Sequence, residues 1–167
     1  CSTAQKMLEM GDSPVLFDVF PRMDYISSVL PLNQVTIVTG DVTSMTDLMG
    51  VIKREKVEQV VHTAFMLTAA SKDKPHDGIT VNIGGTSNIL EACRLANIKK
   101  VVFCSSSTIY TRTSIHNLAY PYREDMEFKC VSQRPTTIYA ASKLSCEYLG
   151  LLYNDRYGLD FIALRLA

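Results

Sequence analysis

A tyrosine and a lysine one helical turn apart are the residues of this sequence best suited to proton transfer. Tyr139 and Lys143 lie four residues apart in "YAASK", so in a helix both side chains occupy one face. An ammonium beside a phenol favours the phenolate and lowers a phenol pKa that is about 10 in water. Such a pair suits a general acid/base near neutral pH. The alternative is a core tyrosine that happens to lie near a surface lysine.

A serine cluster precedes this pair by about thirty residues. The segment "SSSTIY" starts at Ser105, directly after an apolar run. A hydroxyl there could hydrogen-bond the substrate oxygen whose proton Tyr139 handles. The order of serine cluster, tyrosine and lysine therefore predicts chemistry at a hydroxyl or carbonyl group. We expect the polar stretch between them, Thr111 to Pro135, to be an irregular loop, as active-site loops often are.

Polar residues after two earlier apolar runs are suited to binding a nucleotide. Asp18 ends "VLFD", where an acidic residue can accept hydrogen bonds from both hydroxyls of an adenosine ribose. Asp41, in "GDV", could meet an adenine amino group with Val42 alongside. An aspartate that only caps a turn is the alternative at both positions.

The next candidate residues along the chain are two small residues after a predicted strand and two polar residues expected to be buried. Thr63 and Ala64 come after "VVH", where a cofactor could approach the backbone closely. We interpret His62 as a structural histidine at a strand end rather than as a base. Asn82 faces inward on a predicted helix, where a buried amide needs partners. The simplest role for Asn82 is to tie this helix to a neighbouring strand.

The elements that must position these residues alternate between strands and helices. Three segments have helical spacing: 44–56, where Ser44 and Asp47 form a capping-box pattern, 76–97, and 137–158, which ends on Gly158. The middle segment has an inward stripe of Ile79, Asn82, Ile83, Thr86, Ile89, Leu90 and Cys93. Short runs rich in Val, Ile, Leu and Phe are typical of buried parallel strands: "PVLFD", "QVTIVTGD", "VEQVVHTA", "KKVVFCSSS" and "LDFIALRLA".

This alternation predicts the α/β class, a doubly wound parallel sheet of about five strands with helices on both faces. In such folds ligands bind at the carboxyl ends of the strands. The polar residues named above all follow a predicted strand or lie in a predicted helix beside one. We therefore expect Asp18, Asp41, Thr63 and Ser106 to lie near one edge of the sheet.

Composition limits the class of protein. The chain has 167 residues, of which 47% are apolar, enough for one domain or a piece of one. Seventeen basic and seventeen acidic residues cancel without a basic cluster, which argues against nucleic acids and membranes as partners. The five cysteines lack zinc-site spacing and are typical of reduced thiols. We expect a soluble, cytoplasmic protein that uses no metal and binds a small molecule or another protein.

Together these motifs make the sequence resemble the extended short-chain dehydrogenase/reductase family, which is named for NAD-dependent epimerases and dehydratases. The resemblance covers nearly the whole chain, and it implies a single, partial NAD(P)-binding Rossmann-like domain over residues 1–167. It is carried by Asp18 after the second strand of the family, "GDV" at 40–42, "VVHTA" at 60–64, "NIGGT" at 82–86, "SSSTIY" at 105–110 and "YAASK" at 139–143.

The resemblance also implies roles for single residues. Tyr139 would be the acid/base, and Lys143 would bind the nicotinamide ribose and lower the pKa of the tyrosine. Ser106, four residues before Tyr110, would orient the substrate oxygen. NAD is expected rather than NADP, because Asp18 would repel a 2′-phosphate, although the nearby Arg22 could accommodate one. The implied cofactor contacts are Asp18, Asp41, Val42, Thr63, Ala64, Asn82, Tyr139 and Lys143.

Some positions depart from the pattern of the family. The first strand and a Gly-x-x-Gly-x-x-Gly loop should start about 20 residues before Asp18, but the seventeen residues there hold one glycine, Gly11. We expect the chain to begin within the first helix and to stop before the substrate domain. We also expect it to be inactive alone. Ser107 and Thr108 replace the Asp-Glu pair of nucleotide-sugar dehydratases, which disfavours elimination, and Thr111 stands where a glycine often occurs.

Three hypotheses follow for the whole protein. The first is an NAD-dependent epimerase or dehydrogenase/reductase that acts on a hydroxyl or carbonyl carbon of a sugar nucleotide or similar small molecule. The second is a non-catalytic dinucleotide sensor, although such relatives tend to lose the tyrosine that is present here. The third is a structural α/β domain without a ligand, which would make every motif a coincidence. A homodimer is compatible with each of them.

Overall fold

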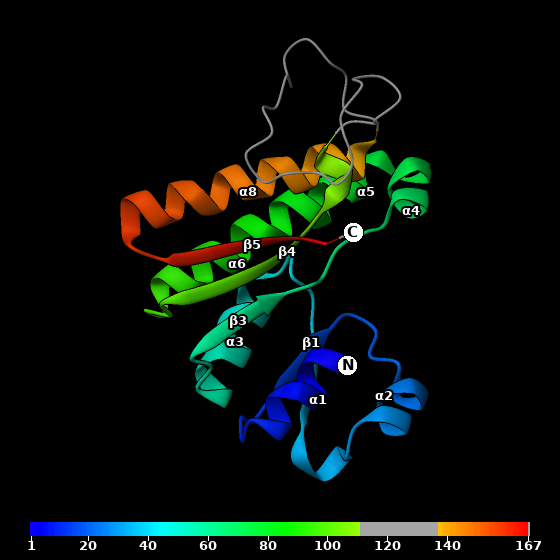
Figure 1. Ribbon diagram of the computed structural model, residues 1–167, viewed down its shortest axis with the longest axis vertical. Coiled ribbons are helices and arrows are strands. Elements are labelled where there is room, and N and C mark those ends of the chain that lie inside the picture. The colour runs from blue at the N-terminus through cyan, green and yellow to red at the C-terminus, as the bar shows by residue number, and fades with distance from the viewer. Residues whose placement is uncertain (111–136, 167) are drawn as a thin grey trace.

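The computed structural model describes residues 1–110 and 137–166 and shows alternating strands and helices (Figure 1). The predicted loop from Thr111 to Pro135 lies outside the described residues. All five predicted strands form. The elements are α1 (Ser2–Glu9), β1 (Val15–Asp18), α2 (Met23–Val29), η1 (Leu32–Gln34), β2 (Thr36–Thr39), α3 (Met45–Glu55), β3 (Gln59–His62), α4 (Thr68–Asp73), α5 (Pro75–Ile79), η2 (Thr80–Gly84), α6 (Gly85–Leu95), β4 (Lys100–Ser106), η3 (Ser107–Ile109), α8 (Ile138–Tyr157) and β5 (Asp160–Leu166).

The strands pair in parallel but form two sheets instead of the single sheet expected from the sequence. β1 pairs with β2, and β3, β4 and β5 pair in that order. No ladder joins β1 to β3 among the described residues. In doubly wound folds these two strands lie on either side of a central first strand, so they are not direct neighbours.

The two-stranded sheet is covered on both faces. Leu16 and Ile37 lie against Ala4 of α1 and Ile26 of α2 in a small core. The alternate residues of the same strands, such as Phe17, join the main core with α3 and α6. This sheet therefore has helices on both faces, as the sequence predicts.

The three-stranded sheet is covered on one face in the described part of the chain. Val101 and Phe103 of β4 point to the covered face and are almost completely buried. Figure 1 shows α6 and α8 lying along this sheet. The opposite face carries large apolar side chains that are 38–55% exposed, and no helix among the described residues covers it. These side chains are Val61, Ile162, Leu164 and Leu166.

Local sequence explains where the site-bearing helices begin and end. Ser44 Oγ accepts a hydrogen bond from the Asp47 N–H at 3.2 Å, as the capping box predicts, but the Asp47 carboxylate accepts from the N–H of Asp41 instead. Thr137 Oγ1 caps α8 in the same way, and Gly158 ends it with a left-handed φ of 66°. This cap places Tyr139 in the first turn of α8.

Residues 75–95 form a nearly continuous helix, interrupted by the π-helical turn η2. The predicted inward stripe is correct for Asn82, Thr86, Ile89, Leu90 and Cys93, which are buried. The prediction is wrong for Ile79, because its side chain is 49% exposed. A π turn contains more residues than an α turn, so it shifts the helical phase of the residues before it.

None of the helices that the structure describes is both long enough and apolar enough to cross a membrane.

Candidate active site

The predicted pair of Tyr139 and Lys143 lies together on one face of α8. Lys143 Nζ is 5.5 Å from the centroid of the Tyr139 ring, which confirms the adjacency expected from the helical spacing. Lys143 is only 3% exposed, and its ammonium donates a hydrogen bond to the carbonyl oxygen of Cys104 on β4. The ammonium also lies 3.6 Å from the ring centroid of Phe65 and 4.6 Å from that of Phe103. The lysine is therefore buried, where the sequence alternative required a surface lysine.

Burial changes the pKa of Lys143. It lowers the pKa of the ammonium to about 8, because the charged form loses solvation, while the nearby acidic groups Cys146, Cys104 and Glu147 oppose this shift. Aromatic ring faces and a carbonyl oxygen replace part of the lost water. At neutral pH the ammonium is still mostly protonated, and it lies directly beside the phenol that it is expected to activate.

Ser106 is the last residue of β4, and its hydroxyl has different partners from that of Ser105. Ser106 Oγ accepts hydrogen bonds from the N–H of Thr108 at 3.2 Å and from its Oγ1 at 3.0 Å. Neither contact uses the hydrogen of the Ser106 hydroxyl, which leaves it available to a substrate oxygen. Ser105 is buried and donates instead to Glu147 at 2.5 Å. These contacts favour Ser106 over Ser105 as the residue that orients a substrate, and this role stays a prediction.

The predicted adenosine-binding residues follow the ends of their strands. Asp18 is exposed, and its Oδ1 accepts from the N–H of Phe20 at 2.8 Å. Asp41 Oδ1 accepts from the N–H of Thr43 at 2.8 Å. Each aspartate thus caps a turn, the alternative considered from sequence, with its second oxygen not used in that contact. Both lie at the carboxyl edge of the sheet, since β1 and β2 are parallel and in register at Asp18 and Thr39.

The residues after β3 are small and accessible, in agreement with a backbone that a cofactor approaches. Thr63 is exposed and Ala64 is half-buried. Val42, in contrast, is buried in the main core, where a Cβ added to Gly85 would lie 2.7 Å from Val42 Cγ2. Asp18 and Asp41 offer carboxylate acceptors, which suit the hydrogen-bond donors of an adenine nucleotide: its ribose hydroxyls and its adenine amino group.

Asn82 is fully buried and bonded to the chain that follows β3. Its Oδ1 accepts from the N–H of Met66 at 2.7 Å, and its Nδ2 donates to the Met66 carbonyl at 3.1 Å. The structure thus shows Asn82 tying its helix to the segment that carries Thr63, Ala64 and Phe65. Its contact with a cofactor stays a prediction.

His62 belongs to a buried polar network. Its Nε2 lies 2.9 Å from Thr86 Oγ1, and that hydroxyl donates to the Asn82 carbonyl, so Nε2 is the donor in the first contact. Burial, with a smaller effect of the Lys143 charge, lowers the pKa of His62 to about 3. His62 is therefore neutral at physiological pH, in agreement with its interpretation as a structural residue.

A buried ion pair beside the site was missed from sequence. Glu147 of α8 is 6% exposed and pairs with Arg165 of β5, with Oε2 and Nη2 2.8 Å apart. Arg165 Nη1 also donates to the Tyr110 hydroxyl at 2.7 Å. Two charged residues could have indicated this pair from sequence. Arg165 interrupts the apolar run "FIALRLA", and Glu147 lies four residues after Lys143, on the same face of the predicted helix.

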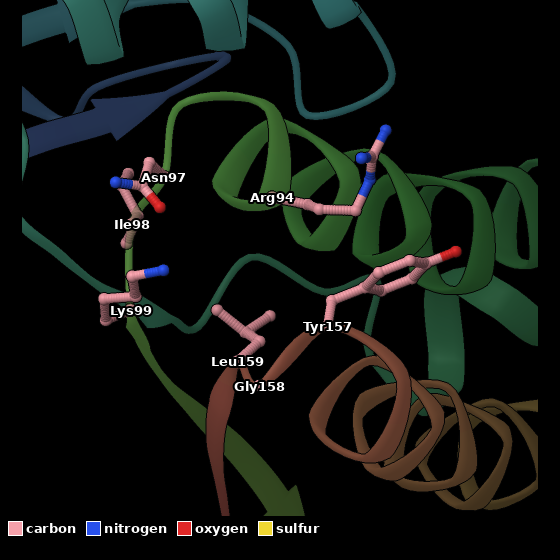
Figure 2. A pocket seen from close by; sticks show the side chains of 7 residues that line it. All are labelled: Arg94, Asn97, Ile98, Lys99, Tyr157, Gly158 and Leu159. Carbon is pink, nitrogen blue, oxygen red and sulfur yellow. The ribbon is translucent and has the colours of Figure 1, made fainter.

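The pocket shown in Figure 2 lies at the other edge of the sheet, where α6 and α8 end and β4 and β5 begin. Its lining residues are Arg94, Asn97, Ile98, Lys99, Tyr157, Gly158 and Leu159. Arg94 pairs with Glu91 at 2.6 Å and lies 5.2 Å from the centroid of the Tyr157 ring. Ligands of doubly wound folds bind at the carboxyl edge, so this pocket is not the candidate site.

Comparison with known proteins agrees with this geometry. Residues 17–167 match the NAD dependent epimerase/dehydratase family. The chain is 32% identical over 126 residues to the UDP-glucuronate 4-epimerase of Thermodesulfobacterium geofontis, covering 75% of this chain and 36% of that protein. It is 36% identical over 116 residues to the UDP-glucose 4-epimerase of Mycolicibacterium smegmatis, covering 68% and 34%.

A solved structure has the same fold. The crystal structure of UDP-glucose 4-epimerase from Brucella ovis in complex with NAD superposes with a TM-score of 0.81 at 28% identity. The match covers 98% of this chain and 46% of that one. The chain thus spans about a third of the length of the two curated relatives and about half of the solved structure. The chain belongs to the NAD-dependent epimerase/dehydratase family of extended short-chain dehydrogenases/reductases and has their doubly wound, Rossmann-like α/β fold.

Proposed function

We propose that the full-length protein is an NAD-dependent epimerase or dehydrogenase/reductase acting on a hydroxyl or carbonyl carbon of a sugar nucleotide or similar small molecule. The observation that carries this proposal is the buried Lys143, which lies beside the Tyr139 ring and is bonded to β4 two residues before Ser106. The two curated relatives described above are sugar-nucleotide 4-epimerases, which supports the substrate class. Residues 1–167 would be one partial NAD(P)-binding domain of this enzyme, which we place in the cytoplasm.

The chemistry divides between cofactor and protein. A bound nicotinamide would supply the hydride acceptor. Tyr139 takes the proton of the substrate hydroxyl and returns it when the carbonyl is reduced. Ser106 donates its hydroxyl hydrogen to the same oxygen and so orients it. The Lys143 ammonium stabilises the phenolate form of Tyr139.

NAD fits the residues at the carboxyl edge of the sheet. Asp18 presents an exposed carboxylate that can accept hydrogen bonds from both hydroxyls of an adenosine ribose. Thr63 and Ala64 leave the backbone after β3 accessible, and Asp41 would meet the adenine amino group. The side chains of Val42 and Asn82 are buried, so each would contribute to NAD binding indirectly. Val42 would offer its backbone, and Asn82 would hold the segment after β3 in place.

The test uses full-length protein incubated with NAD and UDP-sugars. Epimerisation interconverts two sugars, visible by NMR, without net NADH, whereas dehydrogenation accumulates NADH in proportion to product. Protein that binds NAD but does neither, with sugar nucleotides or with simple sugars and alcohols, would support the sensor alternative and overturn this proposal. Elimination is disfavoured, because Ser107 and Thr108 cannot provide the carboxylates that it uses.

A further inference from the structure

A buried polar cluster joins the three elements that surround the candidate site. We define the Glu147 cluster as Ser105 of β4, Tyr110 after η3, Glu147 of α8 and Arg165 of β5. Glu147 Oε1 accepts from Ser105 Oγ at 2.5 Å, and the Arg165 guanidinium contacts both carboxylate oxygens at 2.8–3.3 Å. The cluster therefore fixes α8 against the ends of β4 and β5.

Burial makes the cluster rigid. A buried carboxylate is stable only when it is paired and hydrogen-bonded, so moving α8 relative to β4 would leave a charge without partners. The forked guanidinium also fixes the orientation of the carboxylate, because two parallel N–H groups meet it. The pairing with Glu147 raises the pKa of Arg165 above its usual range, so the guanidinium of the pair stays charged at physiological pH.

The cluster lies next to each proposed catalytic residue. Glu147 is one helical turn after Lys143 and two turns after Tyr139 on α8. Ser105 directly precedes Ser106. Ser105 and Ser106 share a peptide bond, so the contact of Ser105 with α8 holds in place the end of β4 from which the Ser106 side chain projects. The Ser105–Glu147 hydrogen bond therefore joins β4, which ends at Ser106, to α8, which contains Tyr139.

We propose that the Ser105–Glu147 hydrogen bond sets the position of Ser106 relative to Tyr139, which makes Ser105 and Glu147 positioning residues. This inference rests on the proposed function, because Ser106 and Tyr139 act together only in that reaction. Neither Ser105 nor Glu147 needs to touch the substrate. Misplacement by about 1 Å can cost up to 10²-fold in rate, so the contribution of a link of this kind is large enough to measure.

The first experiment compares two variants of full-length protein that each lose one hydroxyl bonded to a glutamate. In S105A we expect kcat to fall about 10- to 100-fold, with the substrate KM and the affinity for NAD within about twofold of wild type. The control is Y153F, because Tyr153 of α8 donates to Glu91 of α6 at 3.1 Å and lies farther along α8 from Tyr139 than Glu147 does. Y153F should keep the wild-type kcat. S105T keeps the hydroxyl and should restore most of the activity.

A double-mutant cycle separates positioning from general support of the fold. If Ser105 acts through Ser106, S105A should lower kcat no further once Ser106 is replaced in S106A. Losses that multiply in S105A/S106A would overturn the inference. In crystals without cofactor, the distance between the hydroxyls of residues 106 and 139 should increase in S105A, and an unchanged distance would also overturn it.

Two further outcomes are decisive. If S105A fails to fold, E147Q takes its place in the cycle, since glutamine keeps the volume but weakens the contacts with Ser105 and Arg165. A folded E147Q with wild-type kcat would contradict the inference. Wild-type protein without activity would overturn the proposed function, whereas active wild type with an equally active S105A would overturn only the positioning role.

Discussion

The ammonium of Lys143 donates a hydrogen bond to the carbonyl oxygen of Cys104, and this contact ties α8 to the end of β4. Cys104 is two residues before Ser106, and Lys143 is one turn after Tyr139. Together with the Ser105–Glu147 contact, it gives the strand and the helix two attachments close to the proposed catalytic residues. The catalytic assignment can be tested at each of these residues.

Replacing Tyr139 by phenylalanine should remove the acid/base without unfolding the protein. We expect Y139F in full-length protein to keep its affinity for NAD and to lose at least about 10²-fold in kcat. Steady-state kinetics and calorimetry with NAD check both parts. The matched control is Y148F, the same substitution at an exposed tyrosine of the same helix, which should keep wild-type turnover. Near-normal turnover in Y139F would exclude Tyr139 from the mechanism.

Replacing Lys143 by methionine should change how stability depends on pH. The pKa of Lys143 is about 8 in the folded protein, below the ordinary 10.5, so between these values the unfolded state binds more protons. Stability from this group therefore rises as the pH increases from about 8 to 10.5. We expect urea unfolding of full-length protein to show a smaller rise, or a steeper fall, over this range in K143M than in wild type.

The control for this measurement is K53M, which removes an exposed lysine of α3. K53M should follow the wild-type pH dependence, because the ammonium of Lys53 is in contact with water in the folded protein as it is in the unfolded chain. If the stability of K143M and of wild type depended equally on pH, burial would not shift the pKa of Lys143. That result would contradict the electrostatic description of the site.

Much of this site follows from local sequence patterns. Helical spacing correctly predicts that Tyr139 and Lys143 are neighbours, and a cap and a glycine correctly bound α8. Apolar runs identify all five strands, because burial of a parallel strand requires a continuous apolar segment. These predictions depend on residues a few positions apart.

The features that were missed depend on contacts between distant parts of the chain. Ser105 meets Glu147 across 42 residues and Tyr110 meets Arg165 across 55, and no local pattern encodes such pairs. The phase error at Ile79 comes from a π turn, which is a hydrogen-bond register that the hydrophobic pattern does not reveal. The division into two sheets likewise depends on which strands become neighbours in space.

Asp18 should determine the choice between NAD and NADP. We expect full-length protein to bind NAD more tightly than NADP, because the exposed carboxylate of Asp18 would repel a 2′-phosphate. D18N, which removes the charge but keeps the size, should narrow the ratio of the two affinities. Arg22 is the rival feature, and it lies 3.4 Å from Asp24. Tighter binding of NADP by wild type in a titration would reverse the assignment.

The 167-residue chain by itself should bind NAD weakly. β1 and β3 form no ladder with each other in the described structure, and the family places a further strand and its glycine loop between them. That loop binds the pyrophosphate through backbone N–H groups at a helix N-terminus. Without it, Asp18 and Lys143 would hold only the two ends of the cofactor. Each buried backbone group that lacks a partner also costs about 1–3 kcal/mol, against a net domain stability of about 5–15 kcal/mol.

The measurement compares residues 1–167 with a version extended at the N-terminus by a strand and a glycine-rich loop of the family. Calorimetry with NAD and thermal melts should show tighter binding and a higher, more cooperative transition in the extended version. A second version, with the loop glycines replaced by alanine, should keep the gain in stability but lose much of the gain in affinity, because a Cβ would block the approach of the pyrophosphate. Comparable affinity and cooperativity in residues 1–167 alone would show that β1 and β3 need no strand between them.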